Sequence, residues 1–228
     1  MSEDFFIFEW PEDETAFVID YFNSLDLENG EFQESLPMGC DTALEALDVS
    51  HWTFKEKMVK PFDSRLVIFD STDEDDDKLS KLVKKMAQES IPMFKGEDSL
   101  EVVRSAVQCY PADDGFMGWH TNANYPAWRI YLTYTEESDK SYISYYDEET
   151  KEEVRSYDKK GITCRAFNLR DTLPLRHCVF AQTQRWSLGF KVYGGEQTKE
   201  PSFYAASPGV TWSLGFKEVN GEQTNEQE

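Results

Sequence analysis

The pattern that most constrains the fold is an alternation of apolar and polar residues that begins near residue 100 and continues to about residue 193. A period of two predicts strands that each bury one face. Gly, Asp and Pro separate these segments and favour turns, and residues 147–151 (DEETK) predict a hairpin tip. The predicted strands span residues 102–110, 119–122, 128–134, 142–146, 162–169, 177–180 and 185–192.

The first 99 residues predict helices with few strands. A helix with residues 12–14 as its acidic first turn is indicated, because Phe17, Val18, Tyr21, Phe22 and Leu25 recur with helical spacing. A second helix is indicated after the acidic run 73–77, which we interpret as its surface cap. Short strands are predicted at 5–10 and 65–69. Helices followed by many short strands favour a mainly β fold of the α+β class, a β-sandwich or jelly roll buttressed by N-terminal helices.

Composition limits the kinds of partner. The chain has 228 residues, enough for one domain, and a formal net charge of -21 with a pI of about 4.5. Such a charge opposes binding to duplex nucleic acid, because that binding depends on Lys and Arg. It favours a soluble protein with a basic partner, or mimicry of a polyanion.

Cysteine usage and the N-terminus predict a cytoplasmic protein. The four Cys form no C-x-x-C motif, so we expect free, mostly buried thiols in a reducing compartment. Residues 1–4 (MSED) lack the basic start of a signal peptide, and no apolar run has the length of a membrane span, so no membrane association is expected. The oligomeric state is not predicted.

The end of the chain contains an internal repeat. The hexapeptide WSLGFK occurs at 186–191 and again at 212–217, and GEQT follows each copy. The second copy has Thr211 where the first has Arg185, so we interpret it as a duplication without a second site. We therefore predict one domain over 1–193, with helical support over 1–99 and a jelly-roll core over 100–193. Residues 194–228 are predicted to be an acidic, partly disordered tail.

Two residue pairs carry candidate chemistry. His120 and Asn122 are two positions apart, so on a strand they face the same side. Taken alone, this pair is more often structural than metal-binding. Arg185 and Ser187 are also two apart, opposite an apolar face formed by alternate residues from Trp186 to Val192. A buried Arg needs an anionic partner, which a small dicarboxylate would supply; an outward-facing Arg is the alternative.

These motifs occur in an order that resembles the Fe(II)/2-oxoglutarate-dependent dioxygenase superfamily, in particular its prolyl-4-hydroxylase-like branch and small phage-encoded oxygenases. The resemblance covers residues 100–193. It includes WHTN at 119–122, RIYLT at 129–133, RAFNL at 165–169, His177, and RWSLGF at 185–190. It implies a double-stranded β-helix, which is a jelly roll, and a phage protein would act in the cytoplasm of its bacterial host.

The resemblance also implies site residues. His120, Asn122 and His177 would hold Fe(II), and Arg185, Ser187 and Tyr131 would bind the distal carboxylate of 2-oxoglutarate. Asn122 stands where the family has Asp; an amide oxygen can coordinate iron but is a poorer ligand. The residues that could replace this carboxylate, Asp113 and Asp114, fall in the loop before the strand, so they are not expected to do so.

The implied function is an iron oxygenase that couples decarboxylation of 2-oxoglutarate to hydroxylation of a substrate, with ascorbate as a further candidate cofactor. A peptidyl side chain in a basic protein or peptide is the expected kind of substrate. The alternative is an inactive acidic binding or inhibitory protein on the same scaffold, such as a nucleic-acid mimic. Asn122 and the net charge of -21 favour this alternative.

Overall fold

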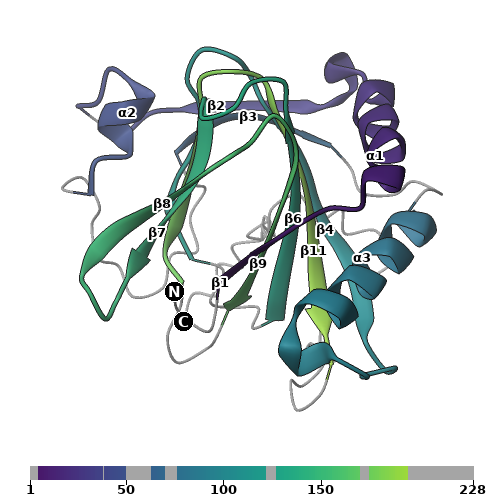
Figure 1. Ribbon diagram of the computed structural model, residues 1–228. Helices are drawn as coiled ribbons and strands as arrows, with labels where there is room; N and C mark the ends of the chain where they lie inside the picture. The colour runs from purple at the N-terminus through teal and green to yellow at the C-terminus, as the bar shows by residue number, and fades with distance from the viewer. Residues whose placement is uncertain are drawn as a thin grey trace, which may run out of the picture.

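A single antiparallel sheet curls on itself to form the body of the molecule (Figure 1). The computed structural model describes residues 5–37, 39–49, 63–69, 76–121, 127–169 and 175–194. The 11-stranded sheet has the order β1-β9-β6-β11-β4-β3-β5-β10-β7-β8, with β2 paired to β3. Its strands are β1 (Phe5–Phe8), β2 (Glu31–Ser35), β3 (Ser64–Phe69), β4 (Glu101–Tyr110), β5 (Gly115–His120), β6 (Ala127–Thr135), β7 (Ser141–Asp147), β8 (Glu152–Tyr157), β9 (Gly161–Leu169), β10 (His177–Ala181) and β11 (Arg185–Tyr193).

The strand order explains how the sheet becomes a roll. β8 and β9 are consecutive in sequence, yet β8 is at one end of the order and β9 is second from the other end. The chain therefore crosses from one half of the sheet to the other in the connection 158–160. Crossings of this kind are typical of jelly rolls. The prediction of a mainly β jelly roll with N-terminal helices is confirmed.

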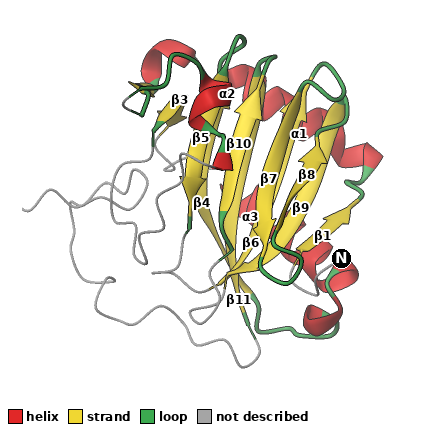
Figure 2. Cartoon of the chain, turned by 90° about the vertical axis from the view of Figure 1, so that its left-hand side faces the viewer, coloured by secondary structure: helices red, strands yellow, loops and turns green. Residues whose placement is uncertain are grey.

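Helices α1 (Glu12–Ser24) and α3 (Asp76–Ser90) cover the outer face of β6, β11 and β4 (Figure 2). Val18 and Phe22 of α1 and Val83 of α3 share one core with Leu188 and Phe190 of β11. Burial of each such side chain stabilises the fold by roughly 1.5–3 kcal/mol. This apolar contact fixes the outer face of β11, so the alternate residues of the strand point into the roll.

The interior of the roll holds a second core, which lies between the two halves of the sheet. Its buried members are Phe5, Leu66, Ile68, Tyr110, Met117, Ile143, Tyr145, Phe167, Leu169, Val179 and Ala181. The short helix α2 (Ala43–Ala46) packs with a third cluster on the outer side of β5 and β10. The indole nitrogen of Trp119 donates to the carbonyl oxygen of Leu47 at 2.9 Å, which joins this helix region to the strand that carries His120.

The predicted strands agree with the observed ones except at three places, one of which is β2, a strand that was not predicted. β5 covers 115–120 rather than 119–122, because all six of its residues are buried and no alternation marks its start. β8 was not predicted, because it is a largely polar edge strand with the sequence EEVRSY. β1, β2 and β3 lie within residues 1–99, so this part of the chain supplies strands as well as helical support.

The four Cys are free and buried, as predicted. No helix in the described part of the chain has the length and apolar character needed to cross a membrane. The predicted tail lies outside the described residues, apart from Gly194.

Candidate active site

Strands β5 and β10 bring His120 and His177 together inside the roll. The two residues are opposite each other in the strand pairing, and their ring centroids are 4.1 Å apart with the planes inclined at 55°. Both are buried, with 5% and 2% of their surface exposed. The ring of Phe167, on β9 in the other half of the sheet, is 5.4 Å from that of His177.

A bulge in β5 gives His120 its inward direction. Met117 pairs with Val179 and His120 with His177, so β5 advances three residues where β10 advances two. In a regular strand, an odd spacing would put Met117 and His120 on opposite faces. The extra residue is absorbed in the bulge, so Trp119 turns outward to the α2 cluster and His120 turns inward. The sequence contained no signal of this bulge beyond Gly118.

Backbone carbonyl groups set the tautomer of both imidazoles. Nδ1 of His120 lies 2.8 Å from the oxygen of Gly118, and Nδ1 of His177 lies 3.0 Å from that of Leu175. A carbonyl oxygen only accepts, so each Nδ1 carries the hydrogen and each Nε2 has the lone pair. Metal-binding histidines commonly have such a carbonyl partner on the other ring nitrogen.

Both histidines are neutral at ordinary pH. Burial lowers the pKa of His177 to about 4. Burial, and then the neighbouring His177, hold the pKa of His120 well below its usual range. Two adjacent neutral imidazoles can serve as metal ligands without first losing protons.

The described residues provide these two candidate ligands but no third. They contain no group of three or more His, Cys, Asp or Glu that could hold a metal ion. The third predicted ligand, Asn122, lies outside the described residues. Asp113 and Asp114 are in the turn before Gly115, at the opposite end of β5 from His120, so they are remote from the pair.

Arg185 lies inside the roll at the other end of the strands from the histidines. It begins β11, pairs with Tyr110 and Thr135, and is 2% exposed. Its Nε donates to the carboxylate of Asp158 at 2.8 Å. Its Nη1 is buried and has no hydrogen-bond partner. Asp158 therefore supplies part of the negative charge that a buried Arg185 needs. Nη1 of Arg185 remains as a buried donor without a partner.

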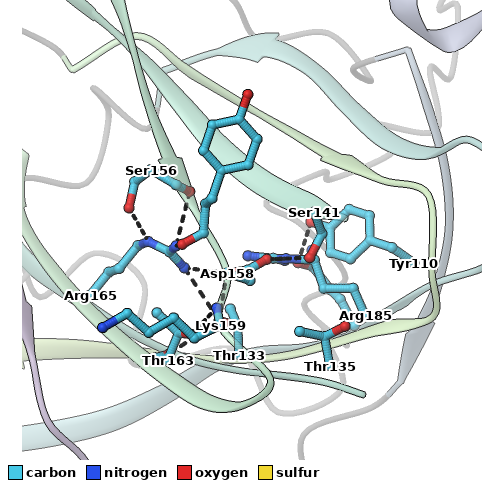
Figure 3. A network of polar contacts seen from close by, with 12 residues as sticks. Tyr110, Thr133, Thr135, Ser141, Ser156, Asp158, Lys159, Thr163, Arg165 and Arg185 are labelled. Atoms are coloured by element: carbon cyan, nitrogen blue, oxygen red, sulfur yellow. Dashed lines mark hydrogen bonds and ion pairs between the residues drawn. The ribbon is translucent and has the colours of Figure 1, made fainter. Parts of the chain in front are cut away.

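Asp158 lies between two arginines (Figure 3). Arg165 of β9 donates to Asp158 from one side at 2.5 Å, and Arg185 donates from the other. The hydroxyls of Thr133 and Ser141 also donate to this carboxylate, at 3.1 Å and 2.5 Å. Burial raises the pKa of Asp158, but Arg185, Arg165 and the hydrogen bond from Ser141 outweigh burial and hold it well below its usual range. The carboxylate is therefore ionised.

Tyr131 connects the two ends of the interior. Its ring stacks on Phe167 with a centroid distance of 5.3 Å, and Phe167 in turn contacts His177. Burial raises the pKa of the Tyr131 phenol, while the charges of Arg129 and Arg185 both act to lower it. Ser187 is buried on β11 and pairs with Thr133 and Gln108. The predicted residues Tyr131, Arg185 and Ser187 thus all lie on β6 and β11, which are paired neighbours.

Asp158 and Arg165 were missed by the sequence prediction. Arg165 is a single charge within an otherwise uncharged strand, GITCRAFNL, and Arg185 begins the strand RWSLGFKVY, whose one other charged residue is Lys191. Two such arginines on strands that both bury their faces indicate a shared carboxylate. The carboxylate itself is in the polar segment DKK at 158–160, which looks like an ordinary surface turn.

The arrangement fits a metal and a small carboxylate. At one end, two neutral imidazoles have lone pairs on Nε2, which suits a transition metal such as Fe(II). At the other, a buried guanidinium has an unpaired donor, which suits an anion. Aromatic and apolar side chains of the interior core lie between them and exclude water.

Comparisons with solved structures identify the class of fold. An oxidoreductase of the 2OG-Fe(II) oxygenase family from Burkholderia pseudomallei is 12% identical, with a TM-score of 0.54, and the match covers 85% of this chain and 88% of that one. A prolyl-4-hydroxylase from Pseudomonas putida is 13% identical, with a TM-score of 0.50, over 83% and 91% of the two chains. Neither protein-family models nor curated proteins give a match. The chain has the double-stranded β-helix fold of these oxygenases, as the resemblance implied.

Proposed function

We propose that this protein is an Fe(II)/2-oxoglutarate-dependent oxygenase that hydroxylates a C–H bond of its substrate. The observation that carries the proposal is the pair of neutral imidazoles, His120 and His177, each of which has its Nδ1 bonded to a backbone carbonyl oxygen. The same interior contains Arg185, whose Nη1 has no hydrogen-bond partner. The similarity of fold to 2OG-Fe(II) oxygenases supports it.

The proposed roles follow from the chemistry of each side chain. His120 and His177 would hold iron through Nε2, and Arg185, Tyr131 and Ser187 would orient the distal carboxylate of 2-oxoglutarate. Bound iron would supply the redox chemistry, in which O2 and 2-oxoglutarate are converted to succinate and CO2 while one oxygen atom enters the substrate as a hydroxyl group. Apolar neighbours such as Phe167 and Val179 would keep water from this reaction. Ascorbate would serve only to keep iron reduced.

Asn122 is the proposed third ligand, through its amide oxygen. A carboxylate is a stronger ligand for a hard cation than an amide. We therefore expect Asn122→Asp to tighten iron binding and to keep or raise turnover. Titration of Fe(II), or of Mn(II) as a stable substitute, into both proteins checks this. Equal metal affinities would remove Asn122 from the metal site.

We propose a basic protein or peptide as the substrate, with a prolyl or other side chain as the target. The net charge of -21 favours a cationic partner over duplex nucleic acid. The name of the Pseudomonas putida neighbour, a prolyl-4-hydroxylase, makes peptidyl proline the first target to test.

Ligand-dependent stability provides the direct test. A ligand present at a hundred times its dissociation constant should add about 2.7 kcal/mol to the free energy of unfolding. We expect Mn(II) and 2-oxoglutarate to raise the melting temperature of the wild type, and Fe(II) with 2-oxoglutarate to yield succinate. His177→Ala should abolish the metal effect. Arg185→Ala should weaken the binding of 2-oxoglutarate by about 2–5 kcal/mol while metal binding persists.

Arg155→Ala is the matched control for Arg185→Ala. Arg155 is exposed on β8 and pairs with Glu153, so its loss should leave both ligands unaffected. If the wild type binds neither metal nor 2-oxoglutarate, the non-catalytic alternative is favoured instead. That alternative is an acidic binding or inhibitory protein on an oxygenase scaffold, and the substitution Asn122 for Asp is the observation behind it.

A further inference from the structure

The Arg165–Asp158–Arg185 cluster contains an unequal number of charges. All three side chains are at most 3% exposed. In the described part of the chain, Asp158 is the one carboxylate bonded to either guanidinium. Two positive charges and one negative charge leave one positive charge in a dry part of the roll. Such a charge is costly to bury unless an anion accompanies it.

Arg165 cannot be the residue that binds this anion. Its five hydrogen bonds use all three nitrogens: Nε donates to Ser156, Nη1 to Thr133 and Asp158, and Nη2 to the carbonyl oxygens of Ser156 and Tyr157. Arg185 differs, because its Nε donates to Asp158 while its buried Nη1 has no hydrogen-bond partner. Of these two arginines, only Arg185 therefore has a buried donor that is left for an anion.

The backbone keeps Asp158 in place between the two arginines. Its N–H donates to the carbonyl oxygen of Ser141 at 2.9 Å, and its own carbonyl oxygen accepts from the N–H of Asp139 at 2.9 Å. The carboxylate thus has a fixed position, in which it contacts both guanidiniums at once. The negative charge of Asp158 interacts with both guanidinium groups. Because Arg165 offsets part of this charge, Asp158 neutralises Arg185 less than it would alone.

We propose that Arg165 is a positioning residue for the distal carboxylate of 2-oxoglutarate, which it does not touch: its charge offsets that of Asp158, and Arg185 is thereby left with positive charge for the ligand. This inference rests on the proposed function. Without Arg165, Asp158 would neutralise Arg185 and the anion would meet a neutral ion pair. At an effective dielectric constant of about 20, a charge about 7 Å away changes a binding constant by about tenfold or more.

The test measures the affinity of glutarate and of 2-oxoglutarate for the metal-free protein by calorimetry. Glutarate has the distal carboxylate but no metal-chelating keto acid, so it reports on the anion site alone. Arg165→Gln should lower the affinity for glutarate about tenfold or more. The double variant Arg165→Gln/Asp158→Asn restores the single net positive charge and should bind within about threefold of the wild type.

A purely structural role gives the opposite order. If Arg165 and Asp158 only support the fold, the double variant loses more bonds than the single variant and should bind no better; that result would overturn the proposal. Arg165→Lys provides a second arm, because it keeps the charge but cannot reproduce five hydrogen bonds. Near-wild-type affinity with a lower melting temperature supports the charge argument, and affinity lost as in Arg165→Gln overturns it.

The outcomes also separate this inference from the proposed function. If the wild type binds neither acid, or if Arg185→Ala leaves their affinities unchanged, the carboxylate anchor itself is wrong and both proposals fail. If binding depends on Arg185 but Arg165→Gln has wild-type affinity, the anchor stands and only the role of Arg165 is lost.

Discussion

The neutral state of the two site histidines makes the metal-free protein sensitive to acid. The pKa of His177 is about 4 in the folded protein against 6.5 for an ordinary His. Between these values the unfolded chain binds a proton that the folded chain does not, so stability falls as the pH decreases from about 6.5 to 4. His177 should therefore lower the free energy of unfolding of the metal-free wild type by about 1.4 kcal/mol for each pH unit within this window.

Urea unfolding of the metal-free protein at pH 7.5 and pH 5.5 checks this prediction. His177→Gln removes one titrating group, so its stability should change less between the two pH values. Equal changes in the wild type and in His177→Gln would contradict the burial of a neutral imidazole at this position.

For individual residues, the sequence predicted that a buried Arg185 needs an anionic partner, but it did not identify that partner. Asp158 is 27 residues away in sequence and lies in a polar turn, where an acidic residue is ordinary. Only the crossing from β8 to β9 brings that turn into the interior. Local sequence patterns do not reveal such a crossing, so Asp158 could not be identified as the carboxylate that Arg165 and Arg185 share.

At the scale of elements, the pairing of β6 with β11 depends on a small residue opposite Tyr131. Gly189 is paired with Tyr131, and a Cβ atom at Gly189 would lie 2.9 Å from Cε1 of Tyr131 and 3.2 Å from Oγ of Ser105. We expect Gly189→Ala to push the Tyr131 ring from its place on Phe167. Affinity for 2-oxoglutarate should then fall about three- to tenfold while metal affinity is kept.

Val103→Ala is the control for this substitution, because Val103 is 42% exposed on the neighbouring strand β4. Calorimetric titration of both variants with 2-oxoglutarate gives the comparison. Unchanged affinity in Gly189→Ala would show that the Tyr131 ring does not contribute to the anion site.

Strands whose sequences alternate between apolar and polar residues were predictable, and strands of other kinds were not. β6, β9 and β11 alternate clearly, since one face packs on the helices and the other faces the interior. β5 is buried throughout, and its bulge changes the alternation between Met117 and His120. The prediction that His120 and Asn122 share a face used only the residues after the bulge, and Asn122 lies outside the described residues.

At the scale of the whole molecule, the last described strand closes the set of paired strands that carry the site. β11 ends at Tyr193 and has β4 on one side and β6 on the other. Gly194 packs closely on this end, since a Cβ atom there would lie 2.2 Å from Cδ2 of Leu100. We expect truncation after Gly194 to leave the melting temperature and 2-oxoglutarate binding nearly unchanged.

Thermal unfolding of the full and truncated chains measures this directly. The second WSLGFK copy lacks an Arg in the position of Arg185, so it should not replace β11 in the sheet. A large decrease in the melting temperature would show that residues after 194 stabilise the domain, and that the predicted boundary is wrong.

The shared carboxylate of Asp158 also has a consequence for the order of events in folding. Its partners come from β6, β7, β9 and β11, which are in both halves of the roll. These bonds can form together only after the halves have closed, so they should be absent from the transition state. Asp158→Asn should therefore speed unfolding and leave the folding rate nearly unchanged, with a φ-value near zero in stopped-flow measurements. The carboxylate that contacts both arginines of the anion site would then govern how long the closed roll survives before it opens.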